Sequence, residues 1–415
     1  MSALPKSVNY GDSMPSLPTD ARCEDVVLRP INGATFAPNQ TIQYDFYNSG
    51  FIQPDSIYLR YNYTITSAGV SSMIGCPVYA PFSRLNVLFG SNQVESQQNF
   101  NQTATMLSNI GLSVSEKFGL QSSYGYAAAA VTTIQDLDGR VCATNETGSF
   151  AGPIPCILSA AEKLIPAFAT PQIRLELVMD NVANMFRADG AAVPTNIVLS
   201  NVELCYRQIH LGSEVEAMVR MMPSIHIKTQ SFLNTASVVS AGSQGQMSLV
   251  YNTRLASIKS MFLLMSSSQA DSNLWGDSSD ITSNNGSYNI TVAGRNYPQT
   301  PLNTALAKNG HLQALRVAAG NIYARDNSFA IDTTEWNYVN GDATTLAEPA
   351  KYIVGVDTEV IDSDYIMSGI SSQNSSITVN ITTGTATTDQ TNVHLLLNYD
   401  AVIELNADGQ ATLKL

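Results

Sequence analysis

Apolar and polar residues alternate in several stretches of this chain, and this alternation constrains the fold more than any other feature of the sequence. In Ile57-Tyr-Leu-Arg-Tyr-Asn-Tyr-Thr-Ile65, isoleucine, leucine and tyrosine would lie on one face, and Arg60, Asn62 and Thr64 on the other. Successive side chains of a β-strand point to opposite faces of a sheet, so this stretch predicts a strand with one buried face. The other stretches that predict strands are 173–179, 202–206, 261–265, 377–382 and 393–399.

Helical patterns are few and short. A helical face formed by Phe100, Ala104 and Leu107 ends at Gly111, and glycine favours the end of a helix. Many strands with few helices, spread over both halves of the chain, predict an all-β fold of two antiparallel sandwiches. The other helical patterns lie at 157–165, 213–222 and 312–322.

The clearest helix start lies near the middle of the chain. Ser213-Glu-Val-Glu216 has the pattern of a capping box, and Pro223 would end the helix that follows. We interpret this helix as the linker between two β domains of similar size. The predicted division is an extended, proline-containing N-terminal arm at 1–20, a first β domain at 21–210, the linker helix at 211–223 and a second β domain at 224–415.

The charge of the chain bears on its partners. Only 13% of the 415 residues are charged, the formal net charge is −13, and neither end carries a block of lysine and arginine. Such a chain is repelled by nucleic acid and by anionic membranes, so we expect no direct nucleic-acid binding. No apolar run approaches the roughly 20 residues that span a bilayer, so we expect no membrane span.

The cysteines show no disulfide framework. Their number is odd, their spacing is wide and no CxxC motif occurs, so we expect reduced, mostly buried thiols. The N-terminus has no apolar stretch of the kind found in secretory signals, which agrees with a reducing compartment. The cysteines are Cys23, Cys76, Cys142, Cys156 and Cys205.

No sequence motif indicates catalysis. Phosphate-binding, dinucleotide-binding, nucleophile-elbow and HExxH motifs are absent. No two histidines lie within four residues of each other, so local metal-ligand spacing is missing too. The sequence therefore predicts no catalytic, cofactor-binding or metal-binding residue, and no cofactor. The four histidines, interpreted as structural, are His210, His226, His311 and His394.

Weaker candidates each have a simpler interpretation. The segment Asp136-Leu-Asp138-Gly139 resembles part of a calcium loop, but a turn explains it better. The stretches 266–300 and 368–391 are rich in Ser, Asn, Asp and Gly, and we expect exposed loops there. Two further groups are an acidic cluster that would suit a divalent ion or a solvated loop (Asp357, Glu359, Asp362 and Asp364), and two tryptophans that would stack on sugars or be buried (Trp275 and Trp336).

Short segments in a fixed order resemble one family along nearly the whole chain. The family is that of the double jelly-roll major capsid proteins of tailless icosahedral DNA viruses, of the polinton-like virus and virophage type. No single segment is specific, but the order, the midpoint helix and the length together carry the resemblance. The segments are Phe51-Ile-Gln-Pro-Asp-Ser-Ile-Tyr-Leu59, Leu164-Ile-Pro-Ala-Phe168, Ile173-Arg-Leu-Glu-Leu177, Asn201-Val-Glu-Leu-Cys-Tyr206, Asn296-Tyr-Pro-Gln299, Leu312-Gln-Ala-Leu-Arg316, Tyr352-Ile-Val-Gly-Val-Asp357, Met367-Ser-Gly-Ile370 and Asn398-Tyr-Asp-Ala-Val-Ile403.

The resemblance implies two side-by-side eight-stranded antiparallel jelly rolls, one at 21–210 and one at 224–415, with a few short helices in loops. It implies a non-enzymatic structural protein that forms pseudo-hexameric trimers and tiles a virion shell. The implied partners are other copies of the chain, penton proteins and minor capsid proteins, and the implied location is the virion, after synthesis in the host cytoplasm or a viral factory.

Two other classes of protein remain open from the residues alone. A glycan- or receptor-binding β-sandwich on a cell or virion surface would also use long polar loops and exposed tryptophans, and an enzyme on a β-sandwich is the third possibility. For the capsid class, the low charge predicts association through weakly polar outward strand faces. The residues expected on such outward faces are Tyr58, Val178, Leu396 and Val402.

Overall fold

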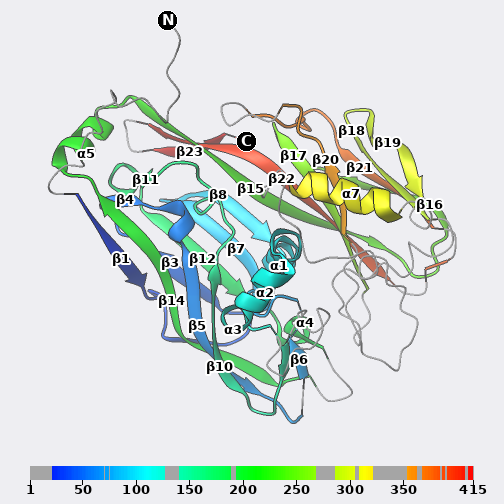
Figure 1. Cartoon of the computed structure of the whole chain (residues 1–415), viewed down its shortest axis with the longest axis horizontal. Helices are drawn as coiled ribbons and strands as arrows, with labels where there is room; N and C mark the ends of the chain where they lie inside the picture. The colour runs from blue at the N-terminus through cyan, green and yellow to red at the C-terminus, as the bar shows by residue number, and fades with distance from the viewer. Residues whose placement is uncertain are drawn as a thin grey trace, which may run out of the picture.

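Two β-sandwiches stand side by side in the computed structural model, with a short helix at one end of the molecule connecting them (Figure 1). The described residues are 21–69, 71–73, 75–126, 140–187, 193–267, 286–303, 308–320, 353–361, 367–383, 386–387, 390–406 and 410–414.

The first sandwich contains eight main strands in two antiparallel sheets. One sheet has the order β1-β14-β5-β10 and the other has the order β3-β12-β7-β8. Numbered along the chain, these are the orders 1-8-3-6 and 2-7-4-5, in which strands distant in sequence pair as Greek keys require. The strands are β1 (Arg22–Leu28), β3 (Thr41–Asp45), β5 (Tyr58–Thr66), β7 (Phe82–Phe89), β8 (Asn92–Gln98), β10 (Thr147–Pro153), β12 (Ile173–Met179) and β14 (Asn196–His210).

The second sandwich repeats both orders. Its sheets are β15-β22-β17-β20 and β16-β21-β18-β19, again 1-8-3-6 and 2-7-4-5. The predicted all-β fold of two eight-stranded jelly rolls is therefore confirmed. The strands are β15 (Ser224–Val239), β16 (Gly245–Tyr251), β17 (Ile258–Ser267), β18 (Ser287–Val292), β19 (Arg295–Asn303), β20 (Ile353–Asp357), β21 (Ile377–Thr383) and β22 (Thr391–Asn406).

The remaining strands are short. In the first half, β13, β6 and β9 form a small third sheet of their own. In the second half, β23 pairs with β22 and extends its sheet. The shorter strands are β2 (Thr35–Phe36), β4 (Phe51–Ile52), β6 (Ser71–Met73), β9 (Arg140–Cys142), β11 (Ile165–Pro166), β13 (Phe186–Arg187) and β23 (Ala411–Lys414).

Strand β5 shows how the sequence pattern builds the first core. Leu59, Tyr61, Tyr63 and Ile65 are buried, and the alternating positions, which begin with Tyr58, are exposed. The ring of Tyr61 meets the rings of Phe82 and Phe150 edge-on, at centroid distances of 5.7 and 5.8 Å. Such edge-to-face contacts contribute stability beyond the burial of area. The alternation thus packs β5 against β7 of the facing sheet.

Strand β22 departs from the alternation because both of its faces are buried. Helix α7 (Lys308–Ala319) lies on β20 in the same sheet, where a Cβ atom on Gly355 would be 2.8 Å from the Cα of Leu315. Leu396, expected on an outward assembly face, is only 1% exposed, so that expectation is wrong. Other parts of the same chain already cover this position.

The helices agree only partly with the sequence. Helix α1 (Phe100–Gly111) and α7 confirm two predictions, whereas the predicted helix at 157–165 is wrong. Residues 157–160 form turns there, and 165–166 belong to β11. The other helices are α2 (Val114–Gly119), α3 (Gln121–Tyr124), α4 (Val182–Met185), α5 (Ser213–Arg220) and the 3-10 turns η2 (Pro54–Ser56) and η4 (Ala167–Ala169).

The linker helix α5 exists, but its predicted capping box does not form. Gly212 occupies the N-cap position and makes no side-chain cap. A capping box instead begins α2, where the Ser113 amide donates to Glu116 Oε2 at 2.7 Å and the Glu116 amide donates to Ser113 Oγ at 3.3 Å. Ser113 and Ser213 are each followed by a glutamate three residues later, so the spacing does not distinguish them. A residue caps a helix only where the backbone enters the helix.

Part of each predicted loop is strand. Strand β18 and most of β19 form a hairpin in 266–300, and β21 lies within 368–391. The expectation of an exposed loop is therefore wrong for the hairpin, whereas β21 confirms the strand predicted at 377–382. Several polar residues of these strands are only half-buried, and they give the stretches their loop-like composition.

The faces of β12 can be tested by two substitutions. Leu177 is fully buried, and Arg174 forms a half-exposed bidentate ion pair with Asp45 at 2.7 and 3.0 Å. We expect Leu177→Ala to lower the free energy of unfolding by about 2–5 kcal/mol. We expect Arg174→Ala to lower it by about 1 kcal/mol or less, because exposed ion pairs contribute little. Denaturant unfolding would measure both, and equal effects would contradict the assignment of faces.

Candidate assembly surfaces

The histidines do not converge on a site. His226 is exposed, 3.9 Å from Glu404, and His311 is buried with its Nδ1 2.8 Å from the hydroxyl of Tyr288. His394 is buried, 3.3 Å from Asn234 Oδ1. Within the described residues, no three His, Cys, Asp or Glu side chains form a group that could hold a metal ion.

The acidic cluster is only partly within the described residues. Glu359 lies 3.2 Å from Lys259 Nζ and accepts a hydrogen bond from the Ser368 hydroxyl, which gives its charge a structural partner. The residues of weaker candidates that lie outside the described residues are Asp136, Asp138, Gly139, Trp275, Trp336, Asp362 and Asp364.

The cysteines are thiols, and no disulfide joins them in the part of the chain that the structure describes. Cys23 is exposed on β1, and the other four are buried. Burial raises the pKa of Cys76 to about 11 and that of Cys156 to about 12, which lowers their thiolate fraction at neutral pH. Cys23 is thus the accessible thiol of the single chain.

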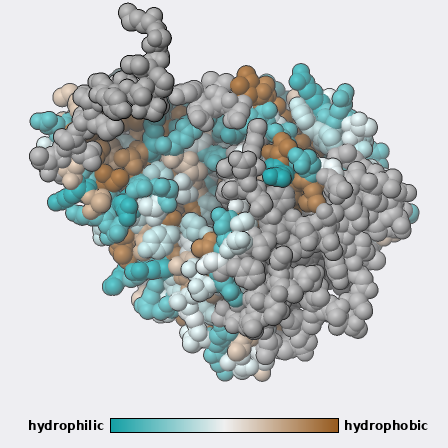
Figure 2. All heavy atoms as spheres, in the orientation of Figure 1, coloured by the Kyte–Doolittle hydropathy of each residue, from teal (hydrophilic) through white to brown (hydrophobic). Residues whose placement is uncertain are grey.

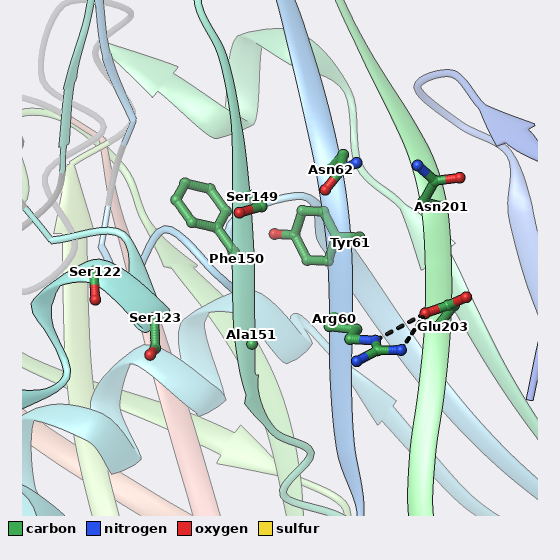
Figure 3. A pocket seen from close by; sticks show the side chains of 10 residues that line it. All are labelled: Arg60, Tyr61, Asn62, Ser122, Ser123, Ser149, Phe150, Ala151, Asn201 and Glu203. Carbon is green, nitrogen blue, oxygen red and sulfur yellow. Dashed lines mark hydrogen bonds and ion pairs between the residues drawn. The ribbon is translucent and has the colours of Figure 1, made fainter. Parts of the chain in front are cut away.

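A hollow of about 490 Å³ lies on the outer face of the β1-β14-β5-β10 sheet (Figure 3). Its side chains are mostly hydroxyls and amides, with Ser122 and Ser123 of α3 on one side. Arg60 Nη2 lies 2.7 Å from Glu203 Oε2 across β5 and β14, so the two charges neutralise each other. The lining also includes Ser149 and Tyr61, and the Glu203 carboxylate in it is held by the ion pair with Arg60.

A seam joins the two jelly rolls where β8 of the first packs beside β15 of the second. The Thr229 hydroxyl donates to the Ile157 carbonyl at 2.6 Å, and the Asn234 amide donates to Thr103 Oγ1 at 3.3 Å. At the rim, Lys228 Nζ lies 3.6 Å from Glu162 Oε1. Helix α1, which carries Thr103, thereby contacts the second roll.

Glu95 lies buried at the centre of this seam. Its carboxylate accepts hydrogen bonds from the Ile157 amide at 2.8 Å, from Gln97 Nε2 at 2.9 Å and from the Ser231 hydroxyl. Burial raises the pKa of Glu95, and these three hydrogen bonds offset only part of that rise. Burying this carboxyl group therefore costs solvation of its charged form.

Replacing this carboxyl group tests its burial. A group whose pKa is raised by folding stabilises the protein fully below its unfolded pKa, and that stability is lost as pH rises through the folded pKa. We therefore expect the melting temperature of Glu95→Gln, relative to the native protein, to become higher as pH rises from about 4.5 to about 7. Scanning calorimetry at both pH values would measure this difference. All other carboxyl groups titrate in both proteins, so a difference independent of pH would contradict the prediction.

The outer sheet faces differ in how far they are closed. On the β3-β12-β7-β8 sheet, polar side chains bond to one another, as where Gln43 Nε2 donates to Glu176 Oε1 at 2.9 Å. On the β1-β14-β5-β10 sheet, Val27 and Tyr58 are exposed, and exposure was expected for Tyr58. The other two residues expected on outward faces are half-buried, Val178 on β12 and Val402 on β22. Exposed apolar side chains also occur on the second roll, where Val238 of β15 and Val250 of β16 are 51% and 56% exposed.

Solved structures show which proteins share this fold. No protein-family model and no curated protein matches the sequence. The PBCV-1 VP54 structure fitted into a reconstruction of the virophage Sputnik matches with a TM-score of 0.65 at 8% identity, over 98% of this chain and 99% of that chain. The Faustovirus major capsid protein matches with a TM-score of 0.62 at 9% identity (96% and 92% covered), and the mavirus major capsid protein with 0.57 at 10% (100% and 95%). The chain has the double jelly-roll fold of these major capsid proteins.

In the described residues, no helix is both long enough and apolar enough to cross a bilayer.

Proposed function

We propose that this chain is the major capsid protein of an icosahedral DNA virus and has no enzymatic role. The observation that carries the proposal is the repeated strand order, 1-8-3-6 and 2-7-4-5, in two complete jelly rolls that match capsid proteins over nearly their whole length. The chain would be made in the host cytoplasm or a viral factory and reside in the virion shell.

The assembling unit is a homotrimer in this proposal. Three chains supply six jelly rolls and give a near-hexagonal outline that tiles a shell, with penton and minor capsid proteins as further partners. The single chain exposes 18601 Å², and interfaces of about 2,000 Å² or more are typical of obligate assemblies. Exposed apolar side chains support association; on and after the linker helix they are Met218, Met221 and Met222.

In the proposed trimer, each part of the chain has its own role. The first roll at 21–210 and the second at 224–415 form the wall, and the linker at 211–223 sits at one end. In α5 no side chain is buried, and Arg220 stacks over Phe168 of the first roll with its guanidinium carbon 5.0 Å from the ring centroid. The arm at 1–20 would pack beneath the trimer or against a neighbour.

The oligomeric state tests the proposal directly. We expect light scattering on the purified protein to give three times the chain mass of 44.6 kDa. Electron microscopy of the source particle should show hexagonally packed blocks with threefold symmetry. A stable monomer at micromolar concentration, unchanged by added salt, would count against the capsid function.

A further inference from the structure

Two cross-strand pairs in the second roll combine the same two residue types and differ in their bonding. On the sheet that contains β16 and β21, Ser248 lies opposite Asn380, and the serine hydroxyl donates to Asn380 Oδ1 at 2.7 Å. On the other sheet, Ser260 of β17 lies opposite Asn398 of β22. Among the residues that the structure describes, neither the Ser260 hydroxyl nor the Asn398 side-chain amide has a hydrogen-bond partner. The second pair thus lacks the bond that the first pair makes.

The unbonded pair is also the buried one. Ser260 and Asn398 are both 0% exposed, whereas Ser248 is exposed. Neither the oxygen nor the nitrogen of the Asn398 amide has a partner in the described part of the chain, so exchanging the two atoms would not supply one. A buried polar group without a hydrogen bond is destabilising, and such groups are few in native proteins. Three such atoms on two facing residues therefore indicate a common partner.

The register of the sheet shows to which face the pair points. Ser260 and Phe262 are two residues apart on β17 and share a face, and Phe262 lies opposite Gly355 of β20. Helix α7 packs on Gly355 through Leu315, and it lies across these strands in Figure 1. Ser260 and its partner Asn398 thus point to the face that carries α7.

Helix α7 separates this face from solvent. Its residue Leu315 is buried and its residue Arg316 is exposed, and Figure 2 shows hydrophobic and hydrophilic residues side by side at the place of the helix. In the first roll the corresponding pair on the eighth and third strands is Glu203 with Arg60, which is partly exposed and joined by an ion pair. A polar pair on an open face binds bulk water, and a polar pair on a covered face needs a partner that stays inside.

We propose that Ser260 and Asn398 together bind an ordered water molecule on this covered face of the second roll. Buried water typically makes about three hydrogen bonds to groups that have no other partner. A water molecule donates to one atom and accepts from another, which suits a hydroxyl opposite an amide that offers both a donor and an acceptor. The inference concerns the interior of the second roll and does not rest on the proposed capsid function.

The surroundings favour a neutral ligand over a metal ion. Asp400 lies two residues from Asn398 on the same face, and its carboxylate accepts hydrogen bonds from the Ser257 hydroxyl at 2.8 Å and from the Ser368 amide at 3.0 Å. The Asn398 Nδ2 group is a donor and would face a cation with the wrong polarity. No group of three His, Cys, Asp or Glu side chains that could hold a metal occurs in the described ranges.

An experimental map that resolves ordered water tests the site directly. We expect density about 2.7–3.2 Å from Ser260 Oγ and from one atom of the Asn398 amide. The exposed pair of Ser248 and Asn380 is the control in the same map, and it should show its direct hydrogen bond. A direct bond between Ser260 and Asn398, or no density between them, would overturn the inference.

Removing the serine hydroxyl tests the site by the sign of its effect. We expect Ser260→Ala to lower the melting temperature by about 2 °C in scanning calorimetry, because the bound water loses a partner. Without water, the same change would remove an unsatisfied hydroxyl and raise the melting temperature. The matched control Ser248→Ala removes the hydroxyl of the exposed pair and should leave the melting temperature nearly unchanged. An unchanged or raised melting temperature of Ser260→Ala would contradict the proposed site.

Combining two substitutions tests whether the residues share one ligand. Asn398→Ala should also lower the melting temperature. In the double variant with Ser260→Ala, the loss should be smaller than the sum of the two single losses, because each change weakens the hold on the same water. Additive losses would show that the two residues bind no common ligand. Circular dichroism checks the folding of each variant, and if Asn398→Ala fails to fold, the serine variants and the map still decide.

Discussion

The packing of β8 against β15 around the Glu95 carboxylate is the contact on which the arrangement of the two jelly rolls depends. One carboxylate binds an amide at Ile157, a side chain of its own strand and the Ser231 hydroxyl of the other roll. Each bond has a direction, so together they fix how the second sandwich meets the first. Helix α1 contacts β15 in the same arrangement, where Asn234 donates to Thr103.

Two buried ionisable groups near this contact respond to pH in opposite directions. Burial lowers the pKa of His394 to about 4, so the folded state holds it neutral and its contribution to stability is lost as pH falls through about 6.5 towards 4. Burial raises the pKa of Glu95, so its contribution is lost as pH rises. Asn234 connects His394 to Thr103 of α1, which places both groups on the boundary between the rolls. The boundary is therefore most stable at an intermediate pH.

Local pattern predicted the strands well because a sheet with one open face is encoded by every second residue. The alternation in β5 and β12 matches burial residue by residue. It predicts β22 as a strand but not the burial of both of its faces, which no local pattern marks. Glu95 was not singled out for the same reason: its partners at Ile157 and Ser231 are distant in sequence. The polar composition of β18 and β19 resembles that of loops, and only their pairing in a sheet distinguishes them from loops.

Helix α5 makes the contact between β8 and β15 intramolecular. A short tether holds β8 and β15 at a high effective concentration, so their contact persists even if it would dissociate as a contact between free chains. A tethered contact can therefore contain a buried carboxylate, which would weaken an interface that must form in dilute solution. The tether thus lets the seam within the chain be permanent without being strong as a contact between free chains.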